Sequence, residues 1–125
     1  SVDAPPTYMG GNSHVSHSAI NRGSVIEGTV ENSVLSPRVT IEKGARISYS
    51  VILPGVTVES GAVIEYAIIG EGCHIGKDCR IGGMPDSVHD GKWDLTVLAP
   101  DCDLEDGREV APGVMLDHHG KEVLK

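Results

Sequence analysis

The sequence between Ser33 and Gly83 repeats with a period of 17 residues. Written in rows, it reads SVLSPRVTIEKGARISY, SVILPGVTVESGAVIEY and AIIGEGCHIGKDCRIGG. An aliphatic residue returns in each row at steps of 6, 6 and 5 residues, and these anchors are Leu35, Ile41, Ile47, Ile52, Val58, Ile64, Ile69, Ile75 and Ile81. Self-similarity at a fixed period indicates that each row is one structural unit stacked on the next.

A second small or apolar residue follows most anchors after four positions. These residues are Val39, Ala45, Val56, Ala62, Cys73 and Cys79. Because four is even, both members of a pair point to the same side of an extended strand. Three short strands per row, joined at Gly-rich corners, predict a triangular coil with an aliphatic interior, the hexapeptide parallel β-helix. A β-sandwich of short strands is the alternative, and three rows in register fit it poorly.

The same spacing continues on both sides of the three rows. Earlier and later anchors are Val15, Ile20, Ile26 and Val30, in a coil with shorter sides, and Leu98, Leu104, Val110 and Leu116. Between them, residues 83–96 (GMPDSVHDGKWDLT) break the rhythm and predict an excursion loop. We therefore expect an all-β domain of four to five coils at residues 14–117, after a linker remnant at 1–13 and before a C-terminal tail at 118–125. Trp93 either pins the loop to the coils or contacts a partner.

Charge and composition exclude several classes of protein. The net charge is −8 and no basic cluster occurs, which argues against nucleic acid or an anionic membrane as partner. No apolar run approaches the length of a membrane span, and the N-terminus does not resemble a signal peptide. Three cysteines are an odd count for a small secreted scaffold, so we expect a reducing cytoplasm. The chain opens Ser-Val without an initiator Met, which we interpret as part of a longer protein.

The histidines and cysteines give no metal-site pattern. His14 and His17 are three apart, so a strand would point them to opposite sides, and His74 follows an inward Cys73 and should face solvent. The other histidines are His89 in the loop and His118 and His119 in the tail. Cys73 and Cys79 are expected to be buried as small apolar residues. With no phosphate loop, nucleophile elbow or paired acids, we expect this chain alone to be non-catalytic and to need no cofactor or metal.

One surface feature predicts a protein contact. An apolar residue that should point outward precedes the first anchor of each row: Val34, Val51 and Ile68, with Ala19 in the shorter coil. Stacked coils would align these residues into an apolar stripe, and such stripes mark subunit or domain interfaces. Tyr49 and Tyr66, at the preceding corner, should lie one above the other beside it. A ladder that only stabilises stacking is the alternative interpretation.

A second feature is a lone cation. Arg38, in SPRVT, is expected on the outer side of a strand, with Arg22 and Arg46 as candidate neighbours. Its planar guanidinium suits a phosphate-bearing effector, although an isolated surface arginine usually serves only solubility.

Two phrases, together with PPTYMG at residues 5–10, resemble a known family. IEGTVENSVL (26–35) and SVILPGV (50–56) are similar to the C-terminal domain of bacterial glucose-1-phosphate adenylyltransferase, also called ADP-glucose pyrophosphorylase. The resemblance covers nearly the whole chain and implies a left-handed β-helix. It also implies a parent enzyme that makes ADP-glucose and pyrophosphate from ATP and glucose 1-phosphate with Mg²⁺, in glycogen synthesis. The family's Gly-rich, Arg-containing nucleotide loop has no match here.

The resemblance further implies partners and a regulatory role. In this family the β-helix packs against its own N-terminal nucleotidyltransferase domain, contributes to a tetramer and helps to form the regulator site. Arg38 matches an arginine that contacts a phosphate of the sugar-phosphate activator, whereas the tail DHHGKEVLK matches none of the family's other basic effector residues. The parent subunit is either catalytic or regulatory, in a homo- or hetero-oligomer.

Three alternatives remain open. A free-standing hexapeptide acyltransferase using CoA would need a catalytic His at a coil junction and a C-terminal helix or extended coil, and no residue stands out for either. A γ-type carbonic anhydrase would need bound zinc. Other sugar-nucleotide pyrophosphorylases, such as the mannose 1-phosphate type, share the β-helix.

Overall fold

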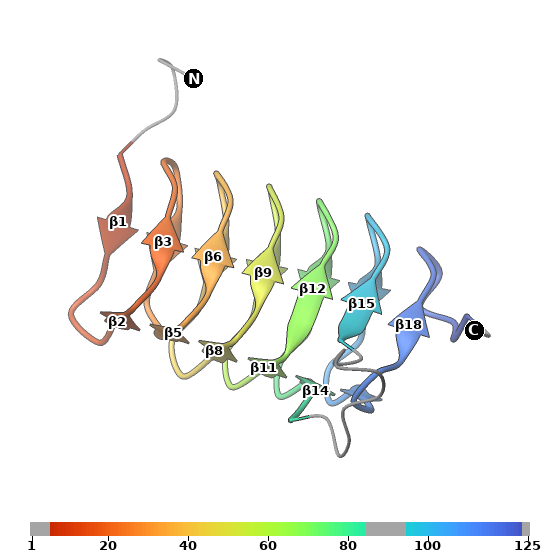
Figure 1. The fold of residues 1–125 in the computed structure, drawn as a ribbon. Helices are drawn as coiled ribbons and strands as arrows, with labels where there is room; N and C mark the ends of the chain where they lie inside the picture. Colours follow the sequence, from red (N-terminus) through yellow and green to blue (C-terminus); the bar gives the residue numbers. More distant parts are fainter. Residues whose placement is uncertain (1–5, 85–94, 124–125) are drawn as a thin grey trace.

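The chain folds into three parallel sheets that wind around one axis (Figure 1). The computed structural model describes residues 6–84 and 95–123, and every regular element in them is a β-strand. Consequently, no helix in this described part is long and apolar enough to cross a membrane. The all-β parallel β-helix predicted from the repeat is confirmed, and the architecture is consistent with the left-handed form.

Each sheet takes every third strand of the chain. Sheet A contains β1 (Tyr8–Met9), β4 (Val25–Ile26), β7 (Thr40–Ile41), β10 (Thr57–Val58), β13 (His74–Ile75) and β16 (Asp103–Leu104). Sheet B contains β2 (His14–Ser16), β5 (Thr29–Glu31), β8 (Arg46–Ser48), β11 (Val63–Glu65), β14 (Arg80–Gly82) and β17 (Glu109–Val110). Sheet C contains β3 (Ala19–Ile20), β6 (Val34–Leu35), β9 (Val51–Ile52), β12 (Ala67–Ile69), β15 (Thr96–Leu98) and β18 (Met115–Leu116).

The helix has about six coils, because each sheet has six strands among the described residues. The expected four to five coils were too few. Strand β1 lies in the segment predicted to be a linker remnant, where the six-residue rhythm of aliphatic anchors is absent. It nevertheless pairs in parallel with β4, Tyr8 opposite Val25 and Met9 opposite Ile26. Backbone pairing therefore extends the helix beyond the coils that the aliphatic pattern reveals.

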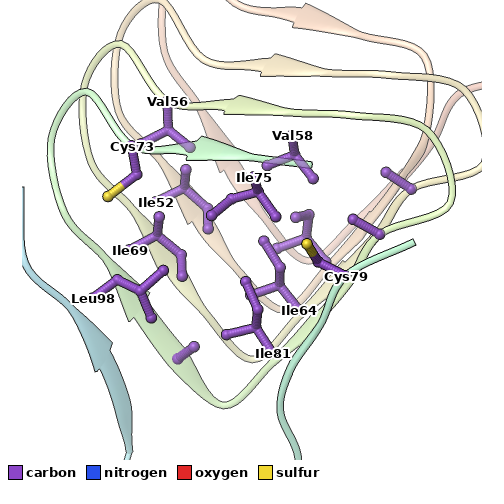
Figure 2. Packing of buried hydrophobic residues seen from close by; sticks show 14 of the residues in the cluster. Ile52, Val56, Val58, Ile64, Ile69, Cys73, Ile75, Cys79, Ile81 and Leu98 are labelled. Atoms are coloured by element: carbon purple, nitrogen blue, oxygen red, sulfur yellow. The ribbon is translucent and has the colours of Figure 1, made fainter. Parts of the chain in front are cut away.

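The interior is a stack of aliphatic side chains (Figure 2). All nine anchors of the three rows are at most 1% exposed, and so are the six residues that follow them by four positions. Parallel pairing keeps equivalent anchors in register, with Ile47 opposite Ile64 and Ile64 opposite Ile81. Burying one such side chain stabilises the fold by about 1.5–3 kcal/mol. Aliphatic residues in this register explain how a chain without Phe builds a core.

The corner between sheets A and B is shorter in one coil than in the others. Between β4 and β5 the turn is only Glu27–Gly28, so Ile26 pairs with Ile41 at a separation of 15 residues. A Cβ on Gly28 would lie 2.4 Å from the carbonyl oxygen of Ala45, inside any normal contact. Glycine is needed here because the backbone of the next coil approaches so closely.

The regular winding is interrupted after β14. Strand β15 begins at Thr96, and the described residues between the two strands are Gly83, Met84 and Leu95. The rest of the predicted excursion loop, including His89 and Trp93, lies outside the described residues. Winding resumes in register across the insertion, with Ile69 opposite Leu98 and Ile81 opposite Val110.

Candidate functional site

An apolar stripe runs along the outer surface of sheet C. Ala19, Val34, Val51 and Ile68 are successive Cα partners in the sheet, as the sequence predicted. Val34 is 46% exposed and Val51 37%, whereas Ile68 is half-buried. The stripe continues onto Val97 and Met115, which the sequence analysis missed because the excursion loop disrupts the 17-residue rows. Every strand of the sheet thus contributes one outward apolar residue.

Two tyrosines form the ridge beside the stripe. The rings of Tyr49 and Tyr66 stack with centroids 4.8 Å apart and planes 5° from parallel, as the one-coil spacing predicted. Both residues have left-handed backbone, with φ of 49° and 50°. They border an open depression of about 340 Å³ whose floor includes Val34 and Val51. An aromatic ridge next to exposed aliphatic side chains is a typical composition for the centre of a protein interface.

A buried hydroxyl ladder supports this corner from inside. Ser33 and Ser50 are each 4% exposed. The Ser33 hydroxyl accepts a hydrogen bond from the Ser50 amide at 3.1 Å, and the Ser50 hydroxyl accepts one from the Ala67 amide at 3.2 Å. Each hydroxyl also donates to a carbonyl two residues earlier, at 2.8 Å. Local hydrogen bonds of this kind hold the left-handed turn in place.

Arg38 lies at a different corner, and its expected position on a strand was wrong. It occupies the turn between β6 and β7, with a left-handed φ of 60°, and its amide donates to the carbonyl of Arg22 at 3.0 Å. Pro37 favours a turn, so the segment SPRV forms the corner before β7 although the sequence SPRVT resembles a strand. Arg22 is therefore its neighbour in the preceding coil, whereas Arg46 lies on sheet B, across the triangle. The Arg38 side chain is exposed.

His74 faces solvent, as predicted, but it has partners that the sequence did not reveal. Its Nδ1 lies 2.8 Å from the Asp103 carboxylate, and its Nε2 contacts the Glu59 carboxylate. The hydrogen bond with Asp103, then that with Glu59, raises the pKa of His74 above its ordinary value, although partial burial opposes this. His74, Asp103 and Glu59 form a cluster. Parallel pairing brings His74 opposite Asp103, although the excursion loop lies between them in the sequence.

Cys73 and Cys79 are buried, as predicted, and Cys102 is buried as well. Cys73, Cys79 and Cys102 are free thiols, each at most 1% exposed. Burial raises the pKa of all three, to about 11 for Cys73, so the thiolate form is disfavoured. Within residues 6–84 and 95–123, no group of three or more His, Cys, Asp or Glu side chains is arranged to hold a metal ion.

Residues 7–97 match the family described as GlmU-like, C-terminal hexapeptide. That segment includes the repeat, the apolar stripe of the first five coils and the tyrosine ridge. The chain belongs to this hexapeptide family. The family places the domain among the parallel β-helices and leaves its role to be argued from its surfaces.

Curated relatives of this hexapeptide domain are proteins of glycogen biosynthesis. The chain is 30% identical over 118 residues to a glucose-1-phosphate adenylyltransferase of Acetivibrio thermocellus, a match that covers 90% of the chain and 28% of that relative. It is 58% identical over 43 residues to the glycogen biosynthesis protein GlgD of Geobacillus stearothermophilus, covering 34% of the chain and 12% of that protein. The family resemblance stated from the sequence is confirmed. The chain spans less than a third of either relative's length.

Among solved structures, the acetyltransferase domain of PglB from Neisseria gonorrhoeae has a similar fold. The TM-score is 0.69, with 19% sequence identity, and the match covers 96% of this chain and 58% of that one. Identity this low shows a shared fold alone. The likeness therefore gives no support to an acyltransferase activity for this chain.

Proposed function

We propose that this chain is the C-terminal assembly and regulatory domain of a glucose-1-phosphate adenylyltransferase. The relationship to such an enzyme over 90% of the chain is the observation that carries the proposal. In the parent protein, an N-terminal nucleotidyltransferase domain binds ATP, Mg²⁺ and glucose 1-phosphate and performs the chemistry. The hexapeptide domain contributes surfaces rather than reacting groups. Three free, buried thiols are in keeping with a reducing cytoplasm.

The apolar stripe is the proposed contact with the nucleotidyltransferase domain. It presents one apolar residue on each of six adjacent strands, about 4.8 Å apart, so it is roughly 24 Å long. Tyr49, 52% exposed, stands at its edge and would supply the aromatic anchor that such contacts favour. Leaving aliphatic side chains of this extent in water is unfavourable, and covering them on docking would stabilise the assembled enzyme.

Arg38 is the proposed contact with a phosphate-bearing effector. Its exposed guanidinium has no ion-pair partner among the described residues, because both ion pairs found there involve His74. A bulky side chain in left-handed backbone costs about 1 kcal/mol relative to glycine, which occupies the same turn position in the next two coils, at Gly55 and Gly72. Retaining arginine against that cost favours a role for its charge.

The enzyme at its native length tests both parts of the proposal. The purified protein is expected to form ADP-glucose from ATP and glucose 1-phosphate. Val51→Asp with Ile68→Asp should weaken its assembly, measured by light scattering, whereas Val25→Asp with Thr40→Asp on sheet A should not. Absence of ADP-glucose formation, in the protein alone and mixed with a related catalytic subunit, would reject the parent assignment.

The effector contact is tested separately. Arg38→Asn keeps a residue that tolerates left-handed backbone and removes the cation. We expect it to abolish activation by a panel of sugar phosphates while the unactivated rate is retained. Lys43→Asn, at the corner between sheets A and B, is the matched control. Unchanged activation in the Arg38 variant would remove Arg38 from the regulator site.

A further inference from the structure

The outer face of sheet B carries two rows of opposite charge. Arg46 on β8 and Arg80 on β14 lie in one row, separated by Val63 on β11. Two residues further along the same strands, Glu31 on β5 and Glu65 on β11 flank Ser48. From strand geometry, members of a row are about 9.5 Å apart and the rows are about 6.6 Å apart. The arginine row and the glutamate row thus run side by side, parallel to the helix axis.

These charges are not paired with one another. The ion pairs among the described residues both involve His74, on sheet A. Arg46 and Arg80 are exposed, and Glu31 and Glu65 are half-buried. Between them lies a depression of about 520 Å³, lined also by Ser48 and Val63, whose short side chains leave space above the sheet. The face therefore has charges of both signs, without ion-pair partners among the described residues, around a hollow.

We propose that sheet B binds a second copy of this chain, side by side, with the two helix axes parallel. A two-fold axis that lies between the facing sheets, parallel to the helix axes, exchanges the two rows. It brings the arginine row of each copy opposite the glutamate row of the other. Arg46 then enters the hollow of the partner above Ser48, between Glu31 and Glu65. This is an isologous contact, in which one surface is complementary to itself.

The charge pattern selects this arrangement over others. A two-fold axis along the strands would instead place each row opposite its own equivalent, so an arginine could meet only Glu109, which lies beside Arg80 in the arginine row, and the two glutamate rows would face each other. The face carries two arginines and three glutamates, Glu109 included, so it is close to neutral. The whole chain carries a net charge of −8, so two copies repel each other over most of their surface. Sheet B therefore combines a nearly neutral face with charges of both signs that can pair between two copies.

This contact is independent of the proposed function. It uses a different sheet from the apolar stripe and requires neither a nucleotidyltransferase domain nor an effector. Its energy comes mainly from charged pairs around a polar hollow, so we expect a weak and salt-sensitive dimer.

Charge reversal and mixing test the proposal on the 125-residue chain. Sedimentation equilibrium in about 50 mM salt should show a dimer whose dissociation constant rises about tenfold or more in about 500 mM salt. Arg46→Glu with Arg80→Glu should weaken association by about tenfold or more, and so should Glu31→Arg with Glu65→Arg. An equimolar mixture of the two variants should form a heterodimer. The first variant has glutamates at all four positions and the second has arginines there, so each attracts the other and repels its own copy.

Two controls separate this face from the rest of the molecule. Arg22→Glu with Arg38→Glu makes the same charge change at the corner between sheets C and A and should leave the dimer intact. Val51→Asp with Ile68→Asp, on sheet C, should also leave it intact. Circular dichroism confirms that each variant is folded. A monomeric wild type at low salt, variants that dimerise like the wild type, or a mixture that stays monomeric would each overturn the proposal.

Discussion

The rings of Tyr49 and Tyr66 lie face to face across adjacent coils, with centroids 4.8 Å apart, although both residues have left-handed backbone. Left-handed backbone costs a bulky residue about 1 kcal/mol or more, whereas Asn adopts it with little penalty. Asn32 occupies this corner position in the preceding coil, with φ of 50°. Stacking returns about 0.5–1.5 kcal/mol. The two effects nearly cancel, so the fold itself gains little from having tyrosine here.

Tyr49→Asn should therefore change the free energy of unfolding by less than about 1 kcal/mol, because relief of backbone strain offsets the loss of stacking. If the tyrosine ridge belongs to an interface, the same variant should weaken assembly of the native-length protein by about tenfold. Urea unfolding and light scattering measure the two effects. Tyr49→Ala is the control for the fold, because it loses stacking without gaining a residue suited to the turn. A loss of several kcal/mol in Tyr49→Asn would show that the ridge is structural.

The stability of the domain should decrease between mildly acidic and mildly alkaline pH because of His74. Its folded-state pKa is raised above the ordinary value of 6.5 by the carboxylates of Asp103 and Glu59. The protonated ring binds both carboxylates, so its stabilising contribution is fully present below pH 6.5 and is lost as the pH rises through the raised pKa. The side chain is 45% exposed, so we expect a change of less than about 1 kcal/mol.

Unfolding in urea from pH 5.5 to pH 8.5 measures this change. His74→Gln keeps a polar side chain but cannot become charged, and its stability should be flatter over the same interval. A wild-type profile with the same slope as that of His74→Gln would show that the cluster makes no net contribution.

Removing one rung of the hydroxyl ladder should destabilise the corner. Ser50→Ala leaves the amide of Ala67 without its acceptor, whereas the carbonyl of Ser48 still accepts from the Tyr66 amide. An unsatisfied buried donor costs about 1–3 kcal/mol, and we expect the free energy of unfolding to fall by that amount. Ser60→Ala is the control, because that serine is only half-buried and bonds to the side chain of Glu42. Equal effects of the two substitutions would contradict the proposed role of the ladder.

The core could be predicted from the sequence because its aliphatic residues recur at regular spacings. The anchor side chains all point toward the helix axis. Parallel pairing keeps equivalent anchors in register, as for Ile64 between Ile47 and Ile81. Exposed residues before the anchors followed from the same rule, which is why Val34 and Val51 were found. The first strand, β1, was missed because backbone hydrogen bonds rather than inward aliphatic residues hold it.

Contacts between residues on either side of the excursion loop could not be predicted from the 17-residue repeat. His74 meets Asp103 at a separation of 29 residues, a spacing that depends on where the chain rejoins the helix. The turn position of Arg38 was also missed, because a left-handed arginine gives no compositional signal of the kind that glycine gives. The charged rows on sheet B emerge only when outward residues of four strands are placed in register.

The short corner at Gly28 should tolerate little added volume. A Cβ at this position would lie 2.4 Å from the carbonyl oxygen of Ala45 and 2.9 Å from that of Glu42, both backbone atoms of the next coil. Because backbone cannot rotate aside as a side chain does, Gly28→Ala should lower the free energy of unfolding by about 1–3 kcal/mol. Gly11→Ala is the matched control, since nothing lies within 4 Å of its Cβ position, and it should change stability by less than about 0.5 kcal/mol. Thermal unfolding of both variants decides the matter: if Gly28→Ala is as stable as Gly11→Ala, the corner is less tightly packed than the structure shows.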